Sequence, residues 1–163
     1  MTAQDKTLST PLHMASLKVN AEIVRLLIEH GADVTVKNQT QSTPLHLASS
    51  WVNARTPTLT RCSTDMNGQD DSDQRFCERN PEWCLLKAET VRLLIKHGAD
   101  VTERDEAQST PLHLASSRAS TETVGLLIEH GASVTARDGN HRTSLHLASS
   151  CVSNRNITTS LLI

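Results

Sequence analysis

Histidine and cysteine are the residue types of this chain that suit metal binding or nucleophilic chemistry, and the eight histidines follow a pattern. Four of them stand fourth in strings of the form T-x-L-H, which begin at intervals of 33, 67 and 33 residues. If each string opens one layer of stacked helices, the imidazoles lie about 8–10 Å apart, too far to share one ion. We therefore expect structural, hydrogen-bonding histidines rather than a metal row, namely His13, His46, His113 and His146.

The four cysteines lack the spacing of a metal or disulfide framework. None of them forms a C-x₂-C pair, so zinc is not expected. The acidic run that begins at Asp65 fails as a calcium loop, because Asp70 stands where the loop requires glycine. The sequence contains no G-x-S-x-G, P-loop or H-E-x-x-H motif. We predict no catalytic residue, no metal site and no cofactor; the cysteines are Cys62, Cys77, Cys84 and Cys151.

The composition argues against several classes of partner. The formal net charge of −2 provides no bulk attraction to nucleic acid or to an anionic membrane surface. The sequence has no run of 18 apolar residues, and residues 1–20 show no basic start followed by an apolar stretch. We expect an intracellular protein, cytoplasmic or nuclear, whose thiols stay reduced. Aromatic residues make up only 2% of the chain, so its core must be aliphatic.

The T-x-L-H strings contain the residues of a helix start. Threonine suits the N-cap, where its hydroxyl accepts a hydrogen bond from a backbone N–H group. Proline, which follows in three of the strings, fits the first helical position. The leucine should then point inward, while an alanine one turn later allows close helix packing. The predicted helices follow Thr10, Thr43, Thr110 and Thr143, and their inward leucines are Leu12, Leu45, Leu112 and Leu145.

A second string, close to V-R-L-L-I-E-H-G-A-D, follows in three of the copies. Its Val24, Leu27 and Ile28 share one face at helical spacing, which predicts an amphipathic helix. The glycine suits a left-handed C-cap, and the histidine before it suits the negative end of the helix dipole. The unit is therefore helix, turn, helix and extended loop, with caps at Gly31, Gly98 and Gly131.

The period of 33 residues, with T-P-L-H-x-A and L-L-I-x-H-G-A-D in register, resembles the ankyrin repeat. The resemblance covers residues 3–154 apart from one interruption. It implies an all-α solenoid of stacked helix-turn-helix units with projecting hairpin loops. Because one unit cannot bury its own apolar face, neighbouring units must complete each other's core. We predict a single domain, 1–163, with units at about 3–35, 36–102, 103–135 and 136–163, the last incomplete.

The second unit carries 34 additional residues, which we place at 55–88. Without them, Ala54 joins Glu89 in the register of the first unit. The segment is polar and rich in turn residues, so we expect a mobile loop. An unspliced or mispredicted intron and an evolved insertion explain it equally well. The fourth unit departs from the repeat at the same column, at Arg155, and its final L-L-I arrives two residues late.

Two turns of each unit depart from the ankyrin pattern, in which glycine is usual. Between the two helices stand Val19, Val52, Ala119 and Val152 instead, and a β-branched residue is strained at positive φ. We expect either that Asn20 or Asn53 takes over the left-handed conformation or that the turn has another geometry. In the hairpins, the replaced glycines are at Leu8, Gln41, Gln108 and His141.

By the same resemblance, partners contact the hairpin tips and the exposed ends of the first helices. This implies a non-catalytic protein-interaction module, which we expect to be monomeric and whose partner the fold does not identify. Trp51 is the preferred anchor, because tryptophan and arginine dominate interface energetics; packing over the inter-helix turn or the insertion is the alternative. The other candidate contact residues are Leu17, Lys18, Gln39, Thr40, Ser42, Ser50, Glu106, Ser109, Arg118 and Arg142.

A second hypothesis gives the chain no binding role. A disrupted second unit and an unfinished fourth would then mark an aberrant, truncated or intron-retaining fragment of a longer ankyrin-repeat protein. A sharp cooperative thermal transition favours the working array, because its units stabilise one another. A broad loss of structure at low temperature favours the fragment.

Overall fold

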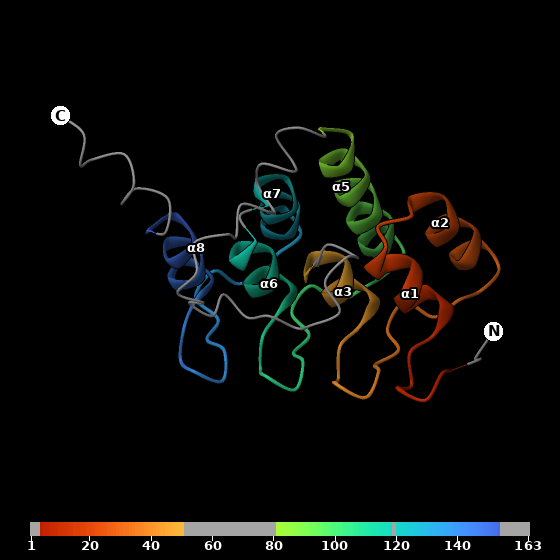
Figure 1. Ribbon diagram of the computed structural model, residues 1–163, viewed down its shortest axis with the longest axis horizontal. Helices are drawn as coiled ribbons and strands as arrows, with labels where there is room; N and C mark the ends of the chain where they lie inside the picture. Colours follow the sequence, from red (N-terminus) through yellow and green to blue (C-terminus); the bar gives the residue numbers. More distant parts are fainter. Residues whose placement is uncertain (1–3, 51–80, 119, 154–163) are drawn as a thin grey trace, which may run out of the picture.

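The structure is a computed structural model that describes residues 4–50, 81–118 and 120–153. These ranges contain seven α-helices and no β-strand, arranged as a stack of helix pairs (Figure 1). The helices are α1 (Pro11–Leu17), α2 (Ala21–Glu29), α3 (Pro44–Ser50), α5 (Pro81–Lys96), α6 (Pro111–Ser117), α7 (Thr121–Glu129) and α8 (Ser144–Ser153).

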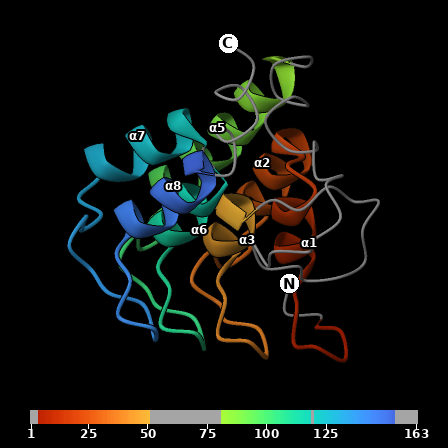
Figure 2. The same ribbon diagram turned by 60° about the vertical axis from the view of Figure 1, so that its left-hand side comes forward.

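The helices form two rows. The first-helix row consists of α1, α3, α6 and α8, each packed on the next, and α2, α5 and α7 form a second-helix row behind it. Hairpin-like loops project side by side from one edge of the stack (Figure 2). The arrangement confirms the predicted all-α solenoid with projecting loops.

Each first helix begins where its T-x-L-H string predicts. Thr10 has an extended backbone (φ −87°, ψ 164°), and its hydroxyl accepts a hydrogen bond of 3.4 Å from the His13 N–H. The His13 ring accepts one of 3.1 Å from the Thr10 N–H in return, which closes a capping box. The same N–H to Nδ1 bond forms from Thr43, Thr110 and Thr143 to the histidine three residues later, at 3.2, 3.2 and 3.3 Å.

The second helices end at glycines in the left-handed conformation, as predicted. Gly31, Gly98 and Gly131 have φ of +81°, +92° and +89°. The histidine before each glycine reaches back one turn, and its Nδ1 lies 2.7–2.9 Å from the carbonyl oxygens of Leu26, Leu93 and Leu126. These side chains satisfy carbonyls that a helix end otherwise leaves without a partner.

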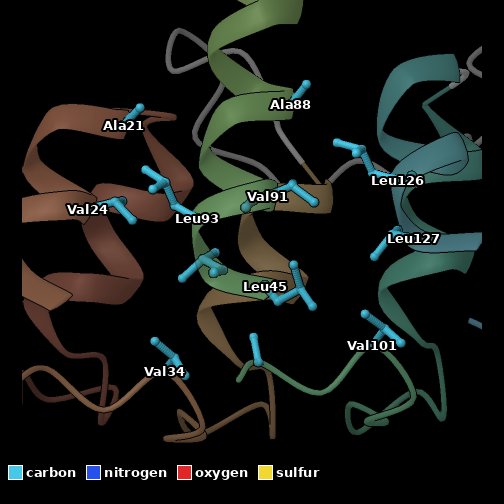
Figure 3. Packing of buried hydrophobic residues seen from close by; sticks show 14 of the residues in the cluster. Ala21, Val24, Val34, Leu45, Ala88, Val91, Leu93, Val101, Leu126 and Leu127 are labelled. Atoms are coloured by element: carbon cyan, nitrogen blue, oxygen red, sulfur yellow. The ribbon is translucent and has the colours of Figure 1, made fainter. Parts of the chain in front are cut away.

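The core is aliphatic and is shared between neighbouring units. Figure 3 shows Val24 and Leu93 meeting between α2 and α5, and Val91 facing Leu126 and Leu127 of α7. The described core contains no aromatic residue. Layers one helix thick leave room for leucine, valine and alanine, which explains the low aromatic content. The most deeply buried leucines are Leu12, Leu45, Leu94, Leu112 and Leu127.

One of the four predicted inward leucines does not point into a core. Leu145 is 70% exposed, whereas Leu12, Leu45 and Leu112 are at most 1% exposed. The helix that carries it, α8, packs on α6, but it is the last described helix and nothing described covers its other side. The prediction for Leu145 was wrong because its burial depends on a following layer.

The helix after the insertion is longer than the repeat requires. Helix α5 begins at Pro81, eight residues before Glu89, so residues 81–88 are helical and the expectation of a loop throughout 55–88 was wrong. Ala88 is 9% exposed and takes the place of Ala21, which is 5% exposed. Residues 55–80 lie outside the described ranges.

The inter-helix turn does not use asparagine for its left-handed residue. Val19 itself has φ +54° and is buried, while Asn20 has φ −93° and caps α2 by accepting a 3.1 Å bond from Ile23 N–H. Of the two alternatives expected for this turn, the one in which Asn20 takes over the left-handed conformation is therefore wrong. Asn53 and Ala119 lie outside the described residues. In the hairpins, Leu8, Gln41, Gln108 and His141 all have φ of 57–59°.

Candidate partner-binding surface

Each hairpin is folded around one aspartate or asparagine at its start. The Oδ1 atom of Asn38 accepts hydrogen bonds from the N–H groups of Thr40 and Ser42, both at 3.0 Å. In the first hairpin, the Oδ1 atom of Asp5 likewise accepts hydrogen bonds from the N–H groups of Thr7 and Ser9, at 2.8 and 2.9 Å. These turns were not recognised from the sequence, although Asp5, Asn38, Asp105 and Asp138 recur with the repeat period.

Backbone hydrogen bonds join the hairpin tips of successive units. The N–H of Gln39 donates to the Thr7 carbonyl, and that of Glu106 to the Thr40 carbonyl, at 2.9 and 3.0 Å. The N–H of Gly139 donates to the Ala107 carbonyl at 2.9 Å. We call this set the tip row: residues 6–7, 39–40, 106–107 and 139–140. Its side chains are exposed, while its backbone spacing is fixed.

The buried T-x-L-H histidines join each unit to the next by hydrogen bonds. Because Nδ1 of His13 accepts from Thr10 N–H, its Nε2 carries the proton and donates to the Ser42 carbonyl at 3.1 Å. His46 and His113 reach the following hairpin in the same way, at 3.2 Å to the carbonyls of Ser109 and Arg142. The prediction that these histidines are structural hydrogen bonders is confirmed. Through these bonds they hold the hairpins that carry the tip row.

Hydrogen bonds stabilise the charged form of two hairpin aspartates, Asp5 and Asp138. The Thr7 hydroxyl and neighbouring N–H groups lower the pKa of the Asp5 carboxyl below 3.8. Burial raises the pKa of Asp138, but hydrogen bonds from Arg142 and Asn140 outweigh it and the net pKa is lowered. Both aspartates are therefore anionic at neutral pH and can hold their turns closed.

The predicted contact residues fall into three groups. Gln39, Thr40, Glu106, Arg142 and Lys18 are exposed, and Leu17, Ser50 and Arg118 are half-buried at the ends of the first helices. Ser42 and Ser109 are buried, at 7% and 9% exposure, because their carbonyls accept bonds from the histidines of the preceding unit. Trp51 lies outside the described residues.

The structure brings the exposed hairpin residues together but not the helix-end ones. Gln39, Thr40 and Glu106 lie in the tip row, along one edge of the stack (Figure 2). Leu17, Ser50 and Arg118 are spread over the ends of three successive helices. A partner that used both groups would have to extend over several units.

A charged cleft beside the second and third hairpins was not expected from the sequence. Its volume is about 530 Å³, and charged residues dominate its lining. Lys37 forms an ion pair of 2.5 Å with Glu103, and the guanidinium of Arg104 donates to the Arg137 carbonyl at 2.7 Å. The Lys37–Glu103 ion pair and the Arg104 hydrogen bond each join two neighbouring units beside this cleft. The acidic residues of its lining are Asp100, Glu103, Asp105 and Glu106.

The described residues show no sign of a metal centre or a membrane span. Within the described ranges, no three side chains of histidine, cysteine, aspartate or glutamate gather in a way that could hold an ion. None of the described helices combines the length and the apolar character that crossing a membrane requires.

Stacked helix pairs, glycine-ended second helices and linked hairpin tips define an ankyrin-type repeat array. The comparison with protein families agrees: the family described as "Ankyrin repeats (3 copies)" matches residues 83–163, and "Ankyrin repeats (many copies)" matches residues 2–54. The chain belongs to the ankyrin-repeat family.

One curated relative shares a short segment with this chain. It is "Protein phosphatase 1 regulatory subunit 27" from Homo sapiens, 62% identical over 29 residues. The aligned segment is 18% of this chain and 19% of the relative, so the chain spans less than a fifth of that protein's length. A match of this extent corresponds to about one repeat unit.

Proposed function

We propose that this chain is a non-catalytic protein-interaction module that binds a partner protein along the tip row and the ends of the first helices. The observation that carries the proposal is the tip row itself. Its side chains face solvent, and its backbone is tied from unit to unit by hydrogen bonds. A surface held in place before binding loses little conformational entropy when a partner docks.

The side chains of this surface suit a polar, extended contact. Gln39, Thr40 and Asn140 offer hydrogen-bonding groups, and Glu106 offers a charge. The half-buried Leu17 adds an apolar contact at the end of α1. Polar rims around a few apolar or aromatic anchors are common in protein interfaces.

Family membership supports the same role, because ankyrin repeats are generally protein-interaction modules. The name of the human relative describes a regulatory subunit of a phosphatase. We propose a role of this kind for the present chain, without assigning it the relative's partner. A partner that binds along the tip row would recognise the spacing of the units as well as single side chains.

Site-specific photo-crosslinking in cells tests where a partner docks. A photoreactive amino acid at Gln39 or Glu106 should give a crosslinked adduct with one partner protein. The matched control places the same group at Arg92 or Glu129, which are exposed on the second-helix row. Equal adducts from both sets of positions, or adducts from the second-helix row alone, would contradict the proposal.

The proposed anchor can be tested once that partner is purified. Trp51→Ala should weaken its affinity by about 2 kcal/mol, the loss typical of an interface hot spot. Titration calorimetry measures this directly. If the affinity is unchanged, Trp51 is not an anchor, although the tip row can still be the binding surface.

A further inference from the structure

The first described unit exposes positions that the interior units bury. Leu26 on α2 is 53% exposed, whereas the equivalent Leu93 and Leu126 are each 8% exposed. Pro11 at the start of α1 is also exposed, whereas Pro44 and Pro111 are buried. These side chains face the side on which, for an interior unit, the preceding unit packs. We call this surface the leading face: Pro11, Ile23 and Leu26.

A small cleft lies beside the leading face. Its volume is about 100 Å³, and it opens between the start of α1 and the end of α2. Its lining is mainly apolar, with Pro11, Leu12, Leu27, Ala32 and Val36 among the residues. An apolar cleft at the end of a repeat array is the place where a further layer would complete the core.

The other end of the described array has matching exposed positions. Leu145 of α8 is 70% exposed and Val134 is 42% exposed, whereas Val34 and Val101, the equivalents of Val134, are 6% and 7% exposed. The His146 ring is also exposed, and no hydrogen bond joins its Nε2 to another described residue. We call Val134, Leu145 and His146 the trailing face.

The hydrogen bonds between interior units show which donor and acceptor groups lack their equivalent partners at the two ends of the described array. In the interior, a histidine Nε2 donates to the carbonyl that ends the next hairpin, as His46 does to Ser109. At the two ends, the equivalent groups are His146 Nε2 and the Ser9 carbonyl, which accepts from Asp5 N–H as the Ser109 carbonyl accepts from Asp105. In the tip row, the equivalent groups are the Asn140 carbonyl and the Lys6 N–H. Donors and acceptors therefore correspond between the two ends.

The charges of the two ends are also compatible. The hairpin of the last described unit carries Arg137 and Arg142 against Asp138 alone. The equivalent hairpin of the first unit carries Asp5 and Lys6 and has no net charge. The contact therefore brings a hairpin with one excess positive charge against a neutral one, so repulsion between net charges of the hairpins does not oppose association.

We propose that the trailing face of one copy packs on the leading face of a second copy, with α8 against α1 as α6 packs against α3 within the chain. The occupant of both exposed ends is thus another molecule of the same protein. Such a contact joins different surfaces of the two molecules, so it repeats from copy to copy instead of closing a two-fold dimer. It continues the interface already present between units. It departs from the monomer expected from the sequence and is independent of the partner-binding proposal.

Sedimentation equilibrium of the full chain tests the proposal. The monomer mass is 17.8 kDa, and the average mass should rise with concentration between about 10 μM and 1 mM, the range of a weak and small interface. Leu145→Asp and Pro11→Glu each block one face at an exposed position and should each remain at 17.8 kDa. An equimolar mixture of the two variants should form a complex of about twice that mass, because each retains the face that the other lacks.

The control is Leu85→Asp, an equally exposed leucine of an interior unit, which should associate like the unmodified chain. Thermal melts confirm that the variants are folded. An unmodified chain that stays at 17.8 kDa throughout would overturn the proposal. So would self-association of Leu145→Asp alone, which would indicate two-fold pairing through leading faces, or a variant mixture that remains monomeric.

Discussion

Two eight-residue segments that differ only at their second residue lie in the third unit and in the last described unit, and their burial differs. T-P-L-H-L-A-S-S forms α6 and T-S-L-H-L-A-S-S begins α8, and both segments are helical after a threonine bonded to its histidine. Within α6 the leucine, histidine and alanine are completely buried, whereas Leu145 and His146 are exposed. Helix formation in this chain is a local property, but burial is provided by the next unit.

This comparison separates two kinds of stabilisation. Caps and turns act within one unit and should contribute equally at the centre and at the end. Core contacts and inter-unit hydrogen bonds need two units and should contribute only in the interior. Substitutions at equivalent positions can measure the two kinds independently.

The largest contrast is expected at the leucine of the T-x-L-H string. Leu112→Ala should lower the free energy of unfolding by about 3 kcal/mol, because it leaves a cavity between layers. Leu145→Ala should lower it by less than about 0.5 kcal/mol, as for other exposed positions. Urea denaturation followed by circular dichroism measures both. Similar losses for the two variants would show that α8 is covered as fully as α6.

A second contrast lies between unit two, which contains the insertion, and unit three, which does not. Deleting residues 55–88 should raise the free energy of unfolding by about 2 kcal/mol, because the connection to the second helix shortens to a few residues. The deletion leaves Ala54 to replace Ala88, so the buried alanine of the second helix is kept. A melting temperature below that of the full chain would mean that residues 81–88 of α5, which include the buried Lys87, stabilise the array.

The pH dependence of stability should come from the interior histidines. Burial lowers the pKa of His13 and His46 below 6.5, so the unfolded chain binds protons more readily than the folded one. Their contribution is complete above pH 6.5 and is lost as the pH falls from there towards the lowered pKa values, by up to about 1.4 kcal/mol per pH unit for each histidine.

Denaturation midpoints between pH 7.5 and 5 measure this loss. Hydrogen bonds from threonines lower the pKa of the Asp33 and Asp100 carboxyls below 3.8. Protonation of these carboxyls therefore changes the stability only at more acidic pH than the range measured. The variant His46→Gln should reduce the slope of this loss, because it removes one of the two histidines whose pKa burial lowers. A profile that is flat from pH 7.5 to 5 would contradict the assigned role.

The smallest effect tests the local kind of stabilisation. Gln108 and His141 both have left-handed backbones, with φ of +57° and +59°. Glycine relieves a strain of about 1–2 kcal/mol there but increases the entropy of the unfolded chain, so each substitution should add about 0.5–1 kcal/mol. Gln108→Gly and His141→Gly should give equal gains in thermal and urea denaturation. A gain at one site alone would show that the hairpin strain depends on its neighbours.

The local features of this fold could be predicted from the sequence because single residue types determine them. Threonine and proline at the starts of the first helices, and glycine at the ends of the second ones, lie where expected. The structural role of His13 also followed from its spacing. Val19 could not be placed, because its strained conformation is tolerated only where the surrounding packing holds it.

Most of the errors concern contacts between units. Nothing within T-S-L-H indicates that Leu145 lacks a covering layer, since the five residues that follow it match those that follow Leu112. The burial of Ser42 and Ser109 follows from histidines in preceding units and is equally invisible in the hairpin sequence. The early start of α5 at Pro81 could not be predicted from a repeat pattern that begins at Glu89.

The hydrogen-bonded tip row has a mechanical consequence. Among the described residues, backbone hydrogen bonds between repeat units occur at the tips, whereas α2, α5 and α7 meet through side chains. A backbone bond resists stretching more than side chains that slide past one another. When the array bends, the tips should therefore keep their spacing while the second helices spread or close, so the tip row is the neutral axis of bending. A ligand bound there would experience a constant pitch whatever the curvature of the rest of the molecule.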